Sequence, residues 1–149
     1  MVVFDFDGVF TNNKVIVSDE GKESVICDRS DGLGLKMLRE KGVLLFILST
    51  EKNLVVMHRA KKLGIDCIHG CENKLMELRK IAKTKKILFK EIAFVGNDIN
   101  DLECLKNVGL PIVVADAYRE VKDIAKIILK KKGGDGAVRE ACEYILIKK

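Results

Sequence analysis

Apolar and polar positions alternate along this 149-residue chain with two periods. Short apolar runs bounded by polar residues or glycine predict strands, and apolar positions three to four residues apart predict amphipathic helices. The predicted strands are residues 2–6, 14–17, 23–27, 43–48, 66–68, 92–95 and 111–114. The predicted helices are residues 33–41, 53–63, 73–83, 101–108, 117–129 and 137–146.

The order of these elements indicates an α/β fold. Strands and helices alternate after residue 30, which predicts a Rossmann-like three-layer arrangement with a central parallel sheet and right-handed crossovers. Two short strands within residues 10–27 are separated by Ser18-Asp19-Glu20-Gly21 and predict one protruding β-hairpin. No repeat or linker interrupts the pattern, so residues 1–149 are expected to form a single domain that ends in a glycine-rich segment and helix, 133–149.

Composition narrows the class of protein. Apolar residues make up 48% of the chain and charged residues 33%, which excludes a disordered, collagen-like or low-complexity chain. The apolar run 43–48 is far shorter than the ~20 residues of a membrane helix. No leader precedes the first strand and the five cysteines follow no disulfide framework, so we expect a cytoplasmic protein with reduced thiols. The net charge of +5 suits an anionic substrate, and with only eight aromatic residues no nucleic-acid partner is expected.

Polar side chains follow four of the predicted strands. Asp5-Phe6-Asp7-Gly8 follows the first, Ser49 and Thr50 follow strand 43–48, and Lys74 begins the helix after strand 66–68. Gly96-Asn97-Asp98-Ile99-Asn100-Asp101 follows strand 92–95. Because ligands bind at the carboxyl ends of parallel strands, these groups are expected to converge on one edge of the sheet.

This set of groups predicts phosphoryl transfer to an aspartate. The Asp5 carboxylate is the predicted nucleophile, and Asp7 is the predicted acid that protonates the leaving alkoxide and the base that then activates water. Ser49 and Lys74 are donors suited to phosphoryl oxygens. Each residue alone has a simpler interpretation, as a capped turn, a helix N-cap or a solvated lysine, and only their order on successive strands favours a site.

A metal site is expected at the same edge. Carboxylates on neighbouring strand tips provide the hard oxygen ligands that Mg²⁺ prefers. The predicted ligands are Asp5, the Asp7 backbone carbonyl and either Asn97 or Asp98, with Asp101 in support. An amide oxygen at position 97 binds Mg²⁺ without contributing charge, so the ion is expected to be held more weakly than by an aspartate.

The same residues resemble the four motifs of the haloacid dehalogenase superfamily of phosphatases. Three further segments are similar to its small capless branch, namely Asp31-Gly32-Leu33-Gly34, Asp116-Ala117 and Gly133-Gly134-Asp135-Gly136-Ala137-Val138-Arg139-Glu140. That branch contains 3-deoxy-octulosonate 8-phosphate phosphatases, nonulosonate 9-phosphate phosphatases and the C-terminal module of acylneuraminate cytidylyltransferases. The resemblance implies a Mg²⁺-dependent enzyme without a cap domain, in a homotetramer whose hairpins form the shared centre and whose neighbouring subunits close each active site.

The resemblance also implies a substrate class. Ser49-Thr50-Glu51-Lys52, with Arg59 and Lys62 on the helix that follows, is similar to the nonulosonate phosphatases, whereas octulosonate enzymes usually have Thr-Gly-Arg or Ser-Gly-Arg there. Thr50, Glu51, Arg59 and Lys62 are therefore expected to contact a sugar acid phosphate, with Arg139 of a neighbouring subunit on the sugar carboxylate. The alternative is that these charges form a solvated helix face.

Other interpretations remain open on the sequence alone. Asn97 also resembles the sialate-linked module, which would make the chain an oligomerisation module with little or no activity. The α/β order is shared with receiver domains, but no aspartate ends strand 43–48, so this alternative is disfavoured. Cys67, His69 and Cys71 have a spacing that fits no common zinc pattern and are expected to be packing residues.

Overall fold

Six parallel strands form the centre of the molecule. The computed structural model describes residues 1–147, so the last two residues of the predicted C-terminal segment lie outside the described part. The strand order is β5-β4-β1-β6-β7-β8. The strands are β1 (Val2–Phe4), β4 (Leu45–Leu48), β5 (Asp66–Ile68), β6 (Ala93–Gly96), β7 (Leu110–Val113) and β8 (Ile127–Ile128). Val2 of β1 pairs with Leu45 on one side and Ala93 on the other, so β1 lies at the centre of the sheet.

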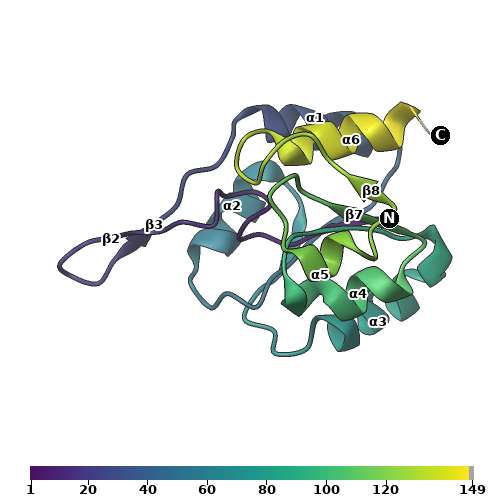
Figure 1. Ribbon diagram of the computed structural model, residues 1–149, viewed down its shortest axis with the longest axis horizontal. Helices are drawn as coiled ribbons and strands as arrows, with labels where there is room; N and C mark the ends of the chain where they lie inside the picture. Colours follow the sequence, from purple (N-terminus) through teal and green to yellow (C-terminus); the bar gives the residue numbers. More distant parts are fainter. Residues whose placement is uncertain (148–149) are drawn as a thin grey trace.

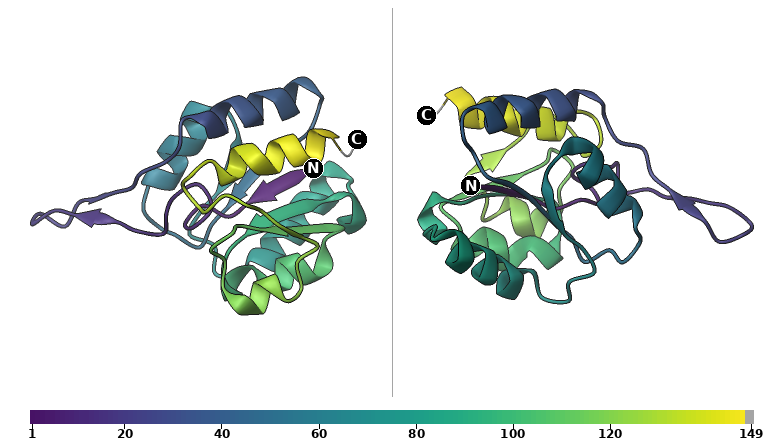
Figure 2. Two further views of the ribbon diagram at one scale, coloured as in Figure 1. Left: turned by 45° about the horizontal axis from the view of Figure 1, so that its top comes forward. Right: turned by 180° about the vertical axis from the view of Figure 1, so that it is seen from behind.

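Helices cover both faces of this sheet and give the expected three layers. α1 and α6 lie side by side on one face, and α3, α4 and α5 line the other (Figures 1 and 2). The helices are α1 (Ser30–Glu40), α2 (Val55–Leu63), α3 (Lys74–Lys85), α4 (Leu102–Asn107), α5 (Arg119–Lys122) and α6 (Ala137–Ile147), with 3-10 turns η1 (Phe89–Glu91) and η2 (Ile99–Asp101). Within residues 1–147, no helix combines the length and the apolar character needed to cross a membrane.

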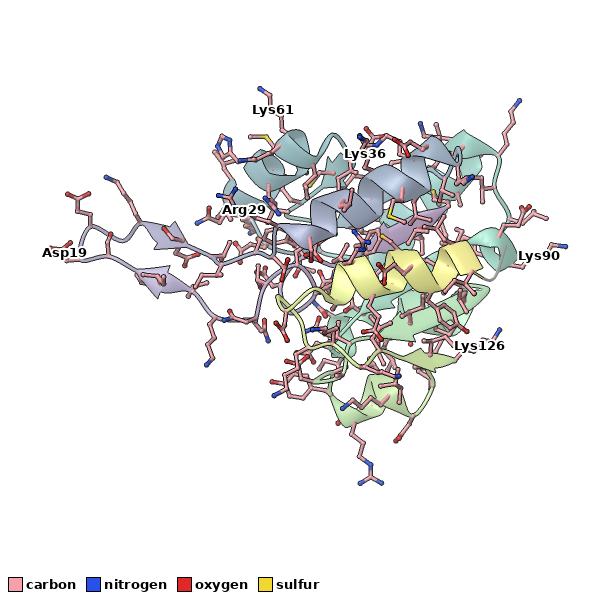
Figure 3. All side chains as sticks on the ribbon, turned by 90° about the horizontal axis from the view of Figure 1, so that it is seen from above. Asp19, Arg29, Lys36, Lys61, Lys90 and Lys126 are labelled. Carbon is pink, nitrogen blue, oxygen red and sulfur yellow. The ribbon has the colours of Figure 1, made fainter. Side chains whose placement is uncertain are left out.

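The predicted hairpin is present between β1 and α1. Its strands, β2 (Ile16–Val17) and β3 (Glu23–Ser24), pair antiparallel and project from the body of the molecule (Figure 1). Asp19 marks the far tip in Figure 3. At the root, Thr11 and Cys27 form an isolated antiparallel bridge. The hairpin therefore leaves the sheet at the edge that carries the candidate site.

The predicted helix 117–129 is wrong. Only the short helix α5 forms, and the chain then turns to add β8 to the edge of the sheet. Lys126 N–H donates to the Pro111 carbonyl at 3.0 Å and Leu129 N–H donates to the Val113 carbonyl at 2.8 Å. The backbone carbonyls of β7 need hydrogen-bond donors, and a strand at this edge supplies them. Ile127 and Ile128 are β-branched and favour a strand, although the apolar residues of 117–129 are spaced as in a helix.

Candidate active site

A buried group of three charged side chains lies at the carboxyl edge of the sheet. Lys74, the first residue of α3, places its Nζ 2.7 Å from Asp5 Oδ1 and 2.7 Å from Asp101 Oδ1. All three residues are at most 3% exposed. Asp5 follows β1, where its N–H still donates to the Val95 carbonyl at 2.9 Å. Two carboxylates thus share one ammonium group, at the strand edge where the sequence predicted these side chains to converge.

Burial shapes the acidity of these groups. It raises the pKa of Asp5 to about 7; the nearby Asp101 carboxylate adds to the rise, and the Lys74 ammonium opposes it. Burial alone lowers the pKa of Lys74, but the carboxylates of Asp5 and Asp101 outweigh it and raise the pKa above the usual lysine value. Lys74 therefore remains charged, and the ionised form of Asp5 depends on the positive charge beside it.

Asp7 lies on the loop that follows Asp5. Gly8 has φ +80°, and a Cβ at this position would collide with the side-chain amide of Asn97, so only glycine allows this turn. Asp7 is partly buried. Burial raises its pKa, as does the negative charge of Glu51, whereas Lys74 lowers it. A raised pKa suits a carboxyl group that must both give and take a proton.

Three oxygen-bearing groups meet beside Asp5. The side-chain amide of Asn97 lies 3.1 Å from Asp5 Oδ2 and 3.1 Å from the Asp7 carbonyl oxygen. In the structure the amide oxygen faces both of these oxygens, an arrangement that a shared cation stabilises; turned over, the amide nitrogen donates to both. Oxygens about 3 Å apart match the edge of an octahedron with metal–oxygen bonds of ~2.1 Å, the geometry that Mg²⁺ demands. The residues present therefore fit Mg²⁺.

Asp98, the alternative ligand, is engaged elsewhere. Its Oδ1 accepts the Ile99 N–H at 2.6 Å and caps η2, although the residue lines the same cleft. Asp101 Oδ2 accepts the Asn97 N–H at 2.9 Å, which fixes the loop that carries Asn97. Among residues 1–147, no group of three or more His, Cys, Asp or Glu side chains is placed to hold one metal ion. The geometry therefore favours Asn97, with Asp101 positioning it.

The open space at this edge is a small cleft. It has a volume of about 70 Å³ and is lined by Asp5, Asp7, Asn13, Ser49, Thr50, Asn97, Asp98 and Asn100. Ser49 Oγ accepts the Glu51 N–H at 3.1 Å, which fixes its position after β4. The cleft has room for a phosphoryl group and an ion but not for the predicted sugar acid. Asn13 and Asn100 line the cleft and were not predicted, because neither belongs to a charged pattern.

Most of the residues predicted to contact the sugar lie away from this cleft. Glu51 does not line the cleft, although its charge raises the pKa of Asp7, and its Oε1 accepts the Asn53 N–H at 2.7 Å. Arg59 and Lys62 line a separate groove of about 630 Å³ beside the hairpin root, where Arg59 Nη2 donates to the Asp28 carbonyl at 2.9 Å. The other residues lining this groove are Val25, Cys27, Arg29, Val55, His58 and Leu63. Arg29, labelled in Figure 3, marks the position of this groove at the start of α1.

The glycine-rich segment packs against its own chain, and its reach to a neighbouring subunit stays a prediction. Arg139 pairs with Glu143 at 2.6 Å on α6 and does not line the cleft. Gly133 and Gly134 pack instead against the backbone of the chain's own catalytic loop, where a Cβ on Gly133 would collide with the Gly8 carbonyl. The first structural role of this segment is therefore to support that loop from behind.

Cys67, His69 and Cys71 were expected to be packing residues, and among residues 1–147 they do not come together in a group of candidate metal ligands. Cys71 Sγ donates to the Ser49 carbonyl at 3.2 Å, beneath the loop that follows β4. Burial raises the pKa of the Cys67 thiol to about 11 and also raises that of Cys71. Cys71 belongs to the buried apolar core and Cys67 packs against it, so both cysteines act as packing residues.

Comparisons with known proteins now decide the family. Residues 46–140 match the family of haloacid dehalogenase-like hydrolases. The chain belongs to this family. Over its whole length it is 30% identical to N-acylneuraminate cytidylyltransferase A of Danio rerio, of which it spans 35%. It is 29% identical over 148 residues to the 3-deoxy-D-manno-octulosonate 8-phosphate phosphatase of Yersinia pestis, covering 99% of this chain and 79% of that protein.

Solved structures agree with this assignment. A HAD family hydrolase from Streptomyces avermitilis matches with TM-score 0.95 and 43% identity, over 97% of this chain and 83% of that one. The 3-deoxy-D-manno-octulosonate 8-phosphate phosphatase of Moraxella catarrhalis, in complex with magnesium, phosphate and KDO, matches with TM-score 0.96 and 34% identity over 99% and 86%. The chain is thus a capless phosphoric monoester hydrolase of a family whose phosphatases depend on Mg²⁺.

Proposed function

We propose that this protein is a Mg²⁺-dependent phosphatase that hydrolyses a 3-deoxy-2-keto sugar acid phosphate through an aspartyl-phosphate intermediate. One observation carries the proposal: the Asp5–Lys74–Asp101 group lies directly beside the oxygens of Asp5, Asp7 and Asn97. A nucleophile, a fixed cation and a set of hard oxygen ligands thus occupy one small cleft. Buried charges of this kind contribute little to stability compared with apolar packing, which favours a catalytic reason for their presence.

The chain's own residues account for both chemical steps. The Asp5 carboxylate attacks phosphorus, the ester P–O bond breaks, and Asp7 gives its proton to the leaving alkoxide. Asp7 then takes a proton from water, whose oxygen attacks the phosphoryl group and breaks its bond to Asp5. Ser49 and Lys74 hold the phosphoryl oxygens throughout.

Asp5, the Asp7 carbonyl and Asn97 would hold the metal ion. When bound, Mg²⁺ neutralises negative charge on the phosphoryl group and on Asp5, which favours the ionised nucleophile. This pocket has a net negative charge, because the two carboxylates of Asp5 and Asp101 face the single ammonium of Lys74. A cation balances that charge. The chemistry of the donor set thus supports the need for the ion.

A nonulosonate 9-phosphate is the substrate we favour. Thr50 lines the cleft, and Glu51, the next residue, lies near enough to Asp7 for its charge to raise the Asp7 pKa. The N-acylneuraminate cytidylyltransferase relative supports a sialic-acid-type sugar. The 3-deoxy-D-manno-octulosonate 8-phosphate phosphatase relatives support the alternative substrate, an octulosonate 8-phosphate. The same cytidylyltransferase relative and Asn97 also support a weakly active oligomerisation module as a second candidate.

We further propose that residues 1–149 form one domain that assembles as a homotetramer in the cytoplasm. The hairpin exposes Val15, Ile16, Val17 and Ile26, each more than half exposed. An isolated two-stranded hairpin is marginally stable in water, so these side chains need a partner surface. Arg59, Lys62 and Arg139 lie outside their own cleft, which supports a role in closing a neighbouring one. The five free cysteines support a reducing compartment.

A hydrolysis screen tests the function. Phosphate release is measured for nonulosonate 9-phosphates, octulosonate 8-phosphate and 4-nitrophenyl phosphate, each with Mg²⁺ and with EDTA. We expect Mg²⁺-dependent turnover of a sugar acid phosphate at least tenfold more efficient than of the aryl ester. Asp5→Asn is the inactive control, since an amide of nearly the same shape cannot attack phosphorus. Activity of Asp5→Asn near the wild-type rate contradicts the aspartyl-phosphate mechanism, and no turnover of any ester favours the oligomerisation module.

A further inference from the structure

Thr11 lies between the catalytic loop and the hairpin and is completely buried. Its Oγ1 accepts the Gly8 N–H at 3.1 Å and the Asn13 N–H at 3.1 Å. Gly8 follows Asp7 directly, and Asn13 lines the cleft in a left-handed conformation with φ 62°. One hydroxyl oxygen therefore fixes the backbone on both sides of the site.

The Thr11 hydroxyl also acts on Asp7. A threonine hydroxyl can accept two hydrogen bonds and donate one. Both acceptor positions are used by backbone N–H groups, so the hydroxyl hydrogen is free to donate, and the Thr11 side chain lowers the pKa of the Asp7 carboxyl group. The Gly8 N–H that Thr11 binds belongs to the peptide unit that follows Asp7, so this hydrogen bond fixes the backbone from which the carboxyl group extends.

The backbone of Thr11 is held as firmly as its side chain. It pairs with Cys27 at the root of the hairpin. On the other side, Gly134 N–H donates to the Val9 carbonyl at 3.1 Å, and a Cβ on Gly134 would lie 2.7 Å from the Thr11 carbonyl carbon. The Thr11 backbone is therefore held between the segment that contains Cys27 and the segment that contains Gly134.

We propose that Thr11 is a positioning residue that orients the Asp7 carboxyl group and ties it to the root of the hairpin. The proposal rests on the function proposed above, in which Asp7 protonates the leaving group. Thr11 itself touches no reacting atom. Loss of the Thr11 hydroxyl is therefore expected to slow the cleavage of esters whose leaving group needs a proton more than the cleavage of esters whose leaving group does not.

The leaving group separates these two kinds of step. An alkyl phosphate, such as 3-deoxy-D-manno-octulosonate 8-phosphate, needs protonation of its leaving oxygen, whereas 4-nitrophenolate leaves without a proton. General acid catalysis contributes ~10²–10⁴-fold, so Thr11→Val is expected to lower kcat/KM for the alkyl ester by roughly 10- to 100-fold and for the aryl ester by less than about threefold. Thr11→Ser keeps the hydroxyl and is expected to restore both values to within about threefold of wild type.

Controls separate positioning from folding. Thr84→Val, an exposed substitution on α3, is expected to change neither ester. Should Thr11→Val not fold, Thr11→Ala removes the hydroxyl without added bulk and must show the same selective loss. Equal losses on both esters, or a serine variant as impaired as the valine variant, overturn the proposal. Wild-type activity of Asp5→Asn would instead refute the proposed function and leave the role of Thr11 in the fold as a separate question.

Discussion

The catalytic loop and the hairpin are consecutive parts of one connection, yet their side chains face opposite environments. Phe6, Val9 and Phe10 of the loop are completely buried, and the rings of Phe6 and Phe10 stack at 5.8 Å. Ile16 and Val17 of the hairpin are 61% and 58% exposed. Apolar side chains hold the loop in place within a single chain, whereas the same residue types on the hairpin have no cover there. The loop that carries the candidate phosphoryl site is thus fully packed within one chain, whereas the hairpin beside it is uncovered.

The two regions also differ in how they treat charge. The catalytic edge buries Lys74, Asp5 and Asp101 as one compact group, and such a group is costly to remove from water unless every member has a partner. The hairpin places its charges, such as the Lys22–Glu20 pair, in solvent. Substitutions at the catalytic edge are therefore expected to act on folding and chemistry together, and those on the hairpin on assembly and specificity.

Removing the ammonium of Lys74 has the largest expected effect. Lys74→Met leaves Asp5 and Asp101 buried without a cation, which is expected to lower the free energy of unfolding by about 3–5 kcal/mol at pH 8 and to abolish turnover. Urea denaturation measures the loss. Lys80→Met, an exposed position on the same helix, is the control and should change stability by less than about 0.5 kcal/mol. Equal stability of the two variants would mean that the buried carboxylates do not need Lys74.

A charge on the hairpin tests the other side of the comparison. Ile16→Lys is expected to dissociate the assembly, because a lysine cannot be buried unpaired against a second hairpin. Light scattering should show the monomer, and kcat/KM should fall at least about tenfold for a sugar acid phosphate while 4-nitrophenyl phosphate changes less than about twofold. Leu88→Lys, at a position 59% exposed and far from the hairpin, is the matched control. If the Ile16→Lys protein stays assembled and keeps its preference for the sugar acid phosphate, the hairpin has no role in assembly or specificity.

Much of the fold was predictable because its elements are locally consistent. The central strands are near-continuous apolar runs, and polar residues follow each at the edge where ligands bind. The grouping of Asp5, Ser49, Lys74 and Asn97 follows from strand order alone. By contrast, β8 depends on pairing with β7, where Ile127 pairs with Ile112 fifteen residues earlier in the chain, and no local pattern in 117–129 reveals this.

Contacts between distant segments were beyond reach for the same reason. The role of Thr11 depends on a bridge to Cys27 and on the close approach of Gly134, which a sequence pattern cannot show. Arg139 has a charge and a motif that suit a substrate, but its side chain pairs with Glu143 at (i, i+4), a contact that helical spacing permits. The four-residue spacing of Arg139 and Glu143 in the sequence is therefore a signal that could have predicted this ion pair.

Asp31 provides a pH-dependent test at the start of α1, where the hairpin returns to the body. It is completely buried; Oδ1 accepts the Arg139 N–H at 3.0 Å, and Oδ2 has no hydrogen-bond partner among residues 1–147. Burial raises its pKa to about 7. The folded protein thus keeps a proton that the unfolded chain, with a pKa near 3.8, releases, so this group's contribution to stability falls as pH rises from about 4 to 7.

Asp31→Asn should remove that pH dependence. An amide cannot ionise, so we expect the Tm of the variant to exceed that of wild type by several degrees at pH 8, from about 1–2 kcal/mol, and not to exceed it at pH 4.5. Asp19→Asn at the exposed hairpin tip is the control and should show no difference between the two pH values. A constant difference between Asp31→Asn and wild type across this range would show that Asp31 stays ionised when buried.

The smallest expected effect concerns the metal. Asn97→Asp puts a negative oxygen 3.1 Å from Asp5 Oδ2 and from the Asp7 carbonyl, so the oxygens repel one another without a cation and bind one more strongly when it is present. We expect a lower Tm in EDTA, a Mg²⁺ dissociation constant roughly three- to tenfold lower, and turnover that saturates at less Mg²⁺. Asn107→Asp, on the exposed end of α4, should leave the Mg²⁺ dissociation constant and the Mg²⁺ needed for turnover unchanged. If the Mg²⁺ dependence of Asn97→Asp matches wild type, Asn97 does not bind the ion, and Asp98, which lines the same cleft, becomes the ligand to test next.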